Sequence, residues 1–354
     1  MSLSDETGPN GMTEKAEVKD DDVIQGVKGA HIQVTTTYPM VSAWEFEFLK
    51  EEEVIRQRLD DCSIYLLVQR PLSYFDNVEF RDGRVYFDIA DRANPALQCR
   101  VDLVDLGICA PGEVIDVETA WHTNEAPQTQ PLRDVAAIRL FRNDGRFILW
   151  WSPHKILYEM LVKGLKVATA DGDPRSFLDF NVLYVGKAFD QKVWDRLTGH
   201  DKMQKIMTVQ NPVGAAPAAR APFEVSLILL TVVGLAEMME IPFMGFATPP
   251  GVKPILHNLD LADEEGLGRF ASEQFVKLRD EAMTREVEAY LIHRFKPTYN
   301  TVKYNNYPDI KGGMRSKGYS WTELEIEDLP AKLATPHSTW DLIGDVDYED
   351  ASDD

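Results

Sequence analysis

The sequence predicts an α+β protein in which a β-rich N-terminal module precedes a mixed domain of strands and helices, with acidic tails. Residues 31–146 contain short alternating or β-branched runs separated by turn signals such as RDGR and RNDGR, a pattern typical of successive strands. Residues 147–319 combine hydrophobic strand-like runs with longer stretches of helical periodicity. Both ends of the chain are rich in Asp and Glu.

These changes in composition place the expected domain boundaries. Residues 1–30 are polar and acidic, which predicts a disordered lead-in. Residues 31–146 form the β-rich module, whose role the sequence leaves open, and residues 147–319 form the mixed domain. Residues 320–354 carry 1 basic and 11 acidic residues and are expected to be a solvated acidic tail.

The elements of the mixed domain follow from its hydrophobic pattern. The stretch HKILYEMLVKGL fits either a helix or a strand, and residues 238–266 are expected to be an irregular insertion. The helix that ends before Pro297 has the clearest periodicity, and proline cannot continue a helix interior. The expected order is a buried strand at 180–188, a helix at 191–207, a second buried strand at 223–233 and a helix at 272–295.

The charge distribution bears on the class of partner. A net charge of −21 argues against a nucleic-acid ligand, because phosphate contacts need Lys and Arg. Residues 147–319, however, carry 21 basic and 20 acidic residues, and residues 293–319 carry six basic residues and one acid, Asp309. The excess of acidic residues therefore lies mostly outside residues 147–319, and the net charge does not exclude a nucleic-acid partner for that segment.

The same composition indicates a cytoplasmic protein without a membrane partner. The start of the chain is polar, and the apolar run 225–235 is too short to span a bilayer. The three cysteines have no spacing typical of a metal site, which predicts reduced thiols.

A strand with a tyrosine and a helix with an Arg–His pair form the first candidate constellation. Arg196 and His200 are four residues apart and share one face of the expected helix. With Tyr184 on the adjoining strand, a hydroxyl and two cations can converge on a phosphate, where they offset negative charge and handle a proton. A strand end beside a solvated helix face is the other interpretation, and these residues alone leave both open.

Glu288 is the candidate metal ligand. It lies inside or beside an apolar arc of its helix, and a carboxylate aimed inward must be paired or bind a cation. Glu286 is rotated from it by roughly 200° and is expected to face water. A Glu at the edge of the apolar stripe is the alternative. The arc consists of Val287, Leu291, Ile292 and Phe295.

Taken in order, these blocks resemble the GIY-YIG nuclease superfamily, in its restriction-endonuclease-like branch. The order Tyr-Val-Gly, Arg-x-x-x-His, Glu, Lys-x-Pro and Tyr-Asn covers about residues 150–308. The resemblance implies a small three-stranded mixed or antiparallel sheet flanked by helices. It also implies a metal-dependent endonuclease that hydrolyses phosphodiester bonds, with DNA as the favoured substrate, in restriction and defence, mobile elements or repair.

The resemblance also implies roles for individual residues. Tyr184 would be the second motif tyrosine, Arg196 would bind the scissile phosphate, and His200 would assist proton handling. Glu288 would hold Mg²⁺ or Mn²⁺, and Asn300 would fix the geometry near the end of the helix.

Two departures from the family pattern concern the first tyrosine and the length of the chain between motifs. A Gly-Ile-Tyr strand is missing from the positions just before Tyr184, so Tyr158 is the best substitute, with a packed core residue as the alternative. The 87 residues between His200 and Glu288 must hold a third strand and added structure.

Basic residues near these motifs are the candidate contacts to a nucleic-acid backbone, interleaved with tyrosines that can stack on bases. A basic surface loop with packed tyrosines is the alternative. The candidates are Lys187, Lys296, Lys303, Lys311, Arg315 and Lys317.

Two other whole-protein interpretations remain. A catalytically inert nuclease-like fold would bind nucleic acid or protein, and the acidic ends would serve a protein partner or imitate DNA. The N-terminal module would supply partner contact or self-association in any of these.

Overall fold

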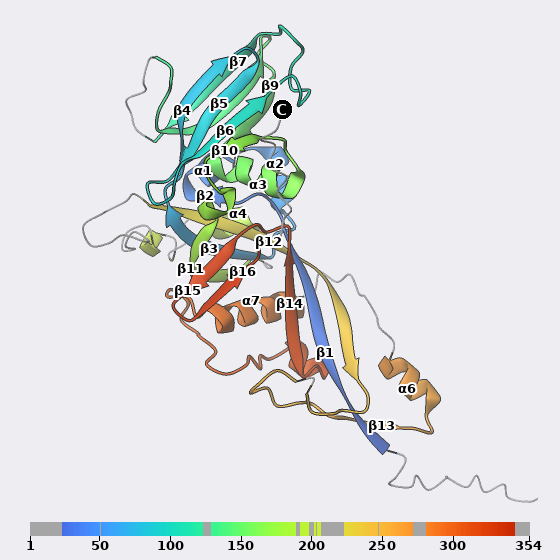
Figure 1. Cartoon of the computed structure of the whole chain (residues 1–354). Coiled ribbons are helices and arrows are strands. Elements are labelled where there is room, and N and C mark those ends of the chain that lie inside the picture. Colours follow the sequence, from blue (N-terminus) through green and yellow to red (C-terminus); the bar gives the residue numbers. More distant parts are fainter. Residues whose placement is uncertain are drawn as a thin grey trace, which may run out of the picture.

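The computed structural model describes residues 23–49, 51–122, 129–188, 192–197, 202, 204–206, 223–246, 248–271 and 281–343. They form a mixed α+β structure dominated by strands, which confirms the predicted class. Two large sheets lie one above the other in Figure 1, with most helices packed beside and between them. Within these residues, no helix combines the length and the apolar character needed to cross a bilayer.

The larger sheet has nine strands in the order β13-β1-β12-β3-β11-β15-β16, with β14 on β1 and β2 on β12. Its longest strands pair antiparallel and extend as a ribbon toward β13 (Figure 1). The strands are β1 (Val23–Thr36), β2 (Val41–Ser42), β3 (Ile64–Pro71), β11 (Asp179–Lys187), β12 (Phe223–Glu240), β13 (His257–Asp260), β14 (Trp321–Glu327), β15 (Lys332–Thr335) and β16 (Ser338–Asp341).

The smaller sheet has seven strands in the order β10-β6-β5-β4-β8-β7, with β9 on β8. All of them lie in the chain between β3 and β11, which are neighbours in the larger sheet. The smaller sheet is therefore an insertion into the larger one. Its strands are β4 (Tyr74–Arg81), β5 (Arg84–Ala90), β6 (Leu97–Asp102), β7 (Ile115–Trp121), β8 (Val135–Arg142), β9 (Phe147–Trp151) and β10 (Ala168–Ala170).

This topology does not divide the chain at residue 146. Strands β1 and β3, expected in the β-rich module, belong to the larger sheet, whereas β9 and β10, expected in the following domain, belong to the smaller one. The boundary expected after residue 146 falls at the tight turn between β8 and β9, which pair with each other. Local turn signals look the same within a sheet and between two sheets, so composition misplaced this boundary.

The helices lie beside the sheets and end at recognisable residues. Helix α3 starts at Ser152, whose side chain accepts a hydrogen bond from the Lys155 N–H at 3.3 Å, and ends at Gly164, in the left-handed conformation. Helix α7 ends just before Lys296, which has a φ of 46°, and Pro297. The helices are α1 (Ala43–Leu49), α2 (Glu53–Leu59), α3 (Pro153–Lys163), α4 (Val193–Leu197), α6 (Glu264–Ala271) and α7 (Glu281–Phe295), with 3₁₀ turns η2 (Pro174–Phe177) and η3 (Met314–Lys317).

Strand β3 divides the hydrophobic core into two clusters. Ile64, Leu66 and Val68 point to the larger cluster, which includes residues of both sheets and of α7. Tyr65 and Leu67 point to the other face, which α1 and α4 cover. Successive residues of a strand face opposite sides, so the position of Tyr65 in the strand places it on the α4 side.

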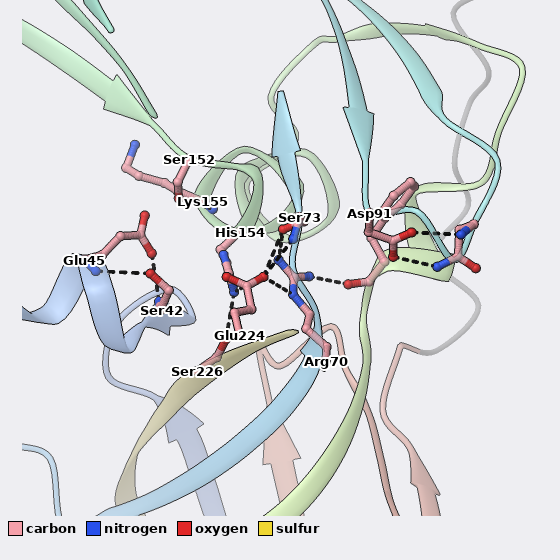
Figure 2. Close-up of polar contacts among 12 residues, drawn as sticks. Ser42, Glu45, Arg70, Ser73, Asp91, Ser152, His154, Lys155, Glu224 and Ser226 are labelled. Atoms are coloured by element: carbon pink, nitrogen blue, oxygen red, sulfur yellow. Dashed lines mark hydrogen bonds and ion pairs between the residues drawn. The ribbon is translucent and has the colours of Figure 1, made fainter. Parts of the chain in front are cut away.

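A buried polar cluster joins the strand ends where the insertion begins (Figure 2). Arg70 Nε of β3 donates to Glu224 Oε1 of β12 at 2.9 Å, and His154 Nε2 of α3 lies 2.9 Å from Ser226 Oγ. Burial lowers the pKa of His154 to about 3, so the ring is neutral. His154 and Ser226 are both buried, so these contacts tie β3, β12 and α3 together rather than form an open hydrolytic site.

The expected acidic tail, residues 320–354, begins with three strands. Leu324 and Ile326 of β14 are buried and alternate with exposed glutamates, and β14 pairs in parallel with β1. The alternation of apolar and acidic residues is a strand pattern, which the excess of acid concealed. Residues 344–354, like the lead-in through residue 22, lie outside the described residues.

Candidate functional site

Two tyrosines meet where β3 and β11 pair. The antiparallel register places Gly186 opposite Tyr65 and Tyr184 opposite Leu67. The two tyrosine rings face the same side, with centroids 6.0 Å apart and an interplanar angle of 38°, and their side chains are hydrogen bonded. Tyr65 is 0% exposed, so its ring is held firmly while Tyr184 reaches the surface.

Gly186 makes this close approach of the tyrosines possible. A Cβ atom added at Gly186 would lie 2.5 Å from the Tyr65 hydroxyl oxygen and 2.7 Å from Cε1 of Tyr184. Both distances are shorter than a normal contact between heavy atoms. The glycine of Tyr-Val-Gly is therefore required by the packing of both rings.

Arg196 of α4 completes one side of the site. Val193 and Leu197 of the same helix are buried in the cluster that contains Tyr65, and this packing turns Arg196 toward the tyrosines. Its guanidinium is hydrogen bonded to the Tyr65 hydroxyl, which raises the pKa of Arg196. Burial raises the pKa of Tyr65, so this tyrosine stays protonated at neutral pH.

Glu288 of α7 faces the same site. Its carboxylate interacts electrostatically with Lys187, at the end of β11, and with Arg196. Burial raises the pKa of Glu288, and these cations, with Arg285, oppose the rise. Among the described residues, no hydrogen bond or ion pair within 4 Å engages its oxygens. A partly buried carboxylate without such partners can accept a metal ion or a ligand proton.

Asn300 holds the tyrosine strand in place. Its Oδ1 accepts from the Val185 N–H at 2.9 Å, and its Nδ2 donates to the Val185 carbonyl at 2.8 Å. The N–H of Tyr299 donates to the Leu183 carbonyl at 3.1 Å. The segment after α7 thus replaces a neighbouring strand at this edge of β11, and it couples the position of Tyr184 to the end of the helix that carries Glu288.

The position of Glu286 in α7 differs from the expectation. Glu286 does not face water: it is 2% exposed, and its carboxylate accepts from the Met314 N–H at 3.2 Å and from Thr322 Oγ1 at 3.0 Å. Both faces of α7 are covered, one by β3 and β11 and the other by β14 and η3, so the helix buries a polar residue on the side expected to be solvated.

The donor set fits one divalent cation with an incomplete protein shell. No cluster of three or more His, Cys, Asp or Glu residues suited to a metal occurs in the described parts of the chain. Mg²⁺ is commonly bound through one or two carboxylates, with water and substrate phosphate oxygens completing the shell. Glu288, a single carboxylate beside cations that favour phosphate, meets that pattern.

One expected site residue, Tyr158, is not at this site, and another, His200, lies outside the described residues. Tyr158 is buried in α3, where its hydroxyl lies 3.3 Å from Thr36 Oγ1, and the tyrosine that lies beside Tyr184 is Tyr65.

The expected nucleic-acid contacts are divided between structural and surface positions. Lys303 donates to the Pro297 carbonyl. Arg315 donates to the carbonyls of Ser320 and, at 3.0 Å, Lys253, so both hold the backbone. The remaining basic side chains lie at the surface or at its edge: Lys187, Lys296, Lys311 and Lys317.

Sequence reasoning missed Tyr65 although its strand was recognised. Ser63-Ile64-Tyr65 opens the run SIYLLVQ, which was assigned to the N-terminal module because more than a hundred residues separate it from Tyr184. The available signal was a tyrosine within a hydrophobic strand, and local sequence does not show which strand pairs with it.

Comparison with known proteins adds no relative: no protein-family profile, curated protein or solved structure matches this chain.

Proposed function

We propose that this protein is a metal-dependent endonuclease of the GIY-YIG type, with DNA as the favoured substrate. The single observation that supports the proposal most is the convergence of Tyr65, Tyr184, Arg196 and Glu288, with Asn300 fixing the tyrosine strand. Ser63-Ile64-Tyr65 supplies the Gly-Ile-Tyr-like first motif that the sequence lacks next to Tyr184. The insertion between the motifs accounts for their separation.

The roles of the side chains follow from their charges and positions. Arg196 binds the scissile phosphate and offsets the negative charge that develops on it. Lys187 neutralises a neighbouring phosphate. Glu288 is the residue that would hold Mg²⁺ or Mn²⁺, and a bound divalent ion would stabilise charge on the leaving oxygen.

The tyrosine pair handles the attacking water. Tyr65 is buried with a raised pKa, so it acts as a hydrogen-bonding group that orients its neighbours rather than as a tyrosinate. Tyr184 is the more accessible of the two and is placed to orient the attacking water through a hydrogen bond. The hydrogen bond between Tyr65 and Arg196 aligns the phosphate-binding cation with the pair.

Cleavage assays test the proposal. Supercoiled plasmid and single-stranded DNA are incubated with the full chain in Mg²⁺, in Mn²⁺ or in EDTA. We expect metal-dependent cleavage that Glu288→Gln and Tyr65→Phe each reduce at least about a hundredfold. The matched controls are Tyr158→Phe in α3 and Glu265→Gln on α6, which should retain wild-type activity.

Two outcomes would contradict the proposal. Absence of cleavage of DNA and RNA by the wild-type chain in either metal would favour a nuclease-like binding module. Equal loss of activity in Tyr65→Phe and Tyr158→Phe would remove the assignment of the first tyrosine.

A further inference from the structure

A cavity lies on the opposite side of α7 from Glu288. Its volume is about 970 Å³, within the range of ligand pockets. Tyr290 and Arg294 line it, and at 3.6 residues per turn they are rotated by roughly 200° and 240° from Glu288. In Figure 1, β14 runs close to one end of α7, and Trp321 of β14 also lines the cavity. The cavity is therefore separate from the candidate active site.

The lining combines cations with aromatic surface. Arg294 and Lys296 supply positive charge, and Tyr290, Trp321 and Phe246 supply aromatic faces. Phe246 is 79% exposed, which is unusual for so large an apolar side chain unless a partner covers it. Such a lining suits a ligand with both an aromatic ring and a negative charge.

Unpaired polar atoms in the lining indicate the chemistry of the missing partner. Nε of Arg294 and Oγ1 of Thr248 are buried and have no hydrogen-bond partner in the described structure. Buried polar groups are normally satisfied, so both residues have unmet hydrogen-bonding capacity, which a small adjustment of the cavity wall would offer to a ligand with acceptor atoms. The Arg294 guanidinium is already held in place, with its Cζ 4.3 Å from the centroid of the Trp340 ring.

The side-chain amides and the charged residues of the lining further restrict the class of ligand that fits the cavity. Asn305 and Asn306 line the same cavity, and their side chains are exposed, so each can both donate to and accept from the edge of a base. Glu323 is the only carboxylate in the described lining, against the two cations Arg294 and Lys296. The cavity therefore favours an anion over a cation.

We propose that this cavity binds a nucleotide with an unpaired base. The base stacks on the aromatic lining, the asparagine amides meet its edge, and the phosphate lies against Arg294 and Lys296. This goes beyond the proposed nuclease activity, because a bound nucleotide here does not require cleavage at Glu288. The same chemistry is offered by a free nucleotide and by an unpaired nucleotide within a strand.

Binding measured in EDTA tests the assignment without cleavage. The probes are a fluorescein-labelled ten-residue oligodeoxythymidine, the same strand annealed to its complement, and AMP as competitor. We expect Phe246→Ala and Lys296→Gln each to weaken binding of the single strand about tenfold, as removal of a stacked aromatic or a phosphate contact does. The matched controls are Phe147→Ala, at a phenylalanine 55% exposed on the smaller sheet, and Lys166→Gln, and they should bind as wild type.

AMP competition distinguishes the two sources of the ligand, and the Glu288→Gln variant distinguishes this inference from the nuclease proposal. If AMP displaces the labelled single strand from the cavity, the ligand is a free nucleotide. If AMP does not displace it, the ligand is a nucleotide within a strand. Glu288→Gln should retain this binding. If the wild-type chain binds the single strand but does not cleave DNA or RNA, the nuclease proposal fails and this inference still holds. Unchanged affinity in both cavity variants, or equal weakening in the controls, would overturn the inference.

Discussion

Replacement of Asn300 by alanine should destabilise the protein by removing the two side-chain hydrogen bonds that hold β11 in place. The two hydrogen bonds to Val185, at 2.9 and 2.8 Å, would be lost. Val185 is buried, and Asn300 is only 8% exposed, so the Val185 N–H and C=O would be left without protein partners. Each unsatisfied buried group costs about 1–3 kcal/mol, and we expect the free energy of unfolding to fall by about 3 kcal/mol.

Equilibrium urea unfolding followed by far-UV circular dichroism measures this change. With a slope of about 3 kcal/mol/M, the unfolding midpoint of Asn300→Ala should shift down by about 1 M. Asn306→Ala is the matched control, because Asn306 is exposed, and its change should stay within about 0.5 kcal/mol.

The aspartate variant separates the two hydrogen bonds. Asn300→Asp keeps the acceptor for the Val185 N–H but places an oxygen where an amide donated to the Val185 carbonyl. We expect it to be at least as unstable as the alanine variant at pH 7. Below the pKa of the new carboxyl it should recover in part, because the protonated form can donate. An Asn300→Ala midpoint equal to that of wild type would refute this account of how the tyrosine strand is held.

Three further predictions concern packing, pH and the buried cluster. Gly186→Ala should lower the free energy of unfolding by about 1–3 kcal/mol, because the added methyl overlaps the facing tyrosine rings. The same variant should lower DNA cleavage at least tenfold. The control is Gly268→Ala, whose added Cβ meets nothing within 4 Å and which should be neutral or stabilising in thermal unfolding. Burial raises the pKa of Glu45 from 4.5 to about 7, so its contribution to stability is complete below pH 4.5 and is lost as pH rises through 7, by at most about 3 kcal/mol. Glu45→Gln should flatten the unfolding free energy measured between pH 5 and 8, and an unchanged slope would exclude Glu45 as its origin. Glu224→Ala leaves the buried Arg70 without its carboxylate and should cost about 3–5 kcal/mol, which urea unfolding against an Arg70→Met/Glu224→Leu double variant can test.

The sequence predicted the local elements better than their assembly. The strand that carries Tyr184, the strand that starts at Phe223 and the end of the helix before Pro297 were each read from periodicity and a proline signal. These features depend on residues within one turn or one strand. A sheet order that brings β3 beside β11 depends on contacts more than a hundred residues apart, which local periodicity does not encode.

The candidate site was predictable in part for the same reason. The expectation that Glu288 and Arg196 lie near each other came from residue type and spacing, and the two side chains interact electrostatically; their chemical roles stay a prediction. Tyr65 was missed because the insertion separates it from its partner strand. The prediction that Glu286 faces water was wrong, because the sequence does not show which distant segment covers that face of the helix.

The place where the smaller sheet joins the larger one has a consequence for how this molecule can be altered. Gln69 and Asn181 are paired across β3 and β11, so the chain departs from and returns to points about 5 Å apart. A segment whose ends are neighbours can be lengthened, shortened or exchanged with little demand on its host. A chimaera in which a short hairpin joins these two strands would retain both tyrosines in register, provided that the apolar surface it uncovers and the polar partners of Arg70 and Ser226 are redesigned.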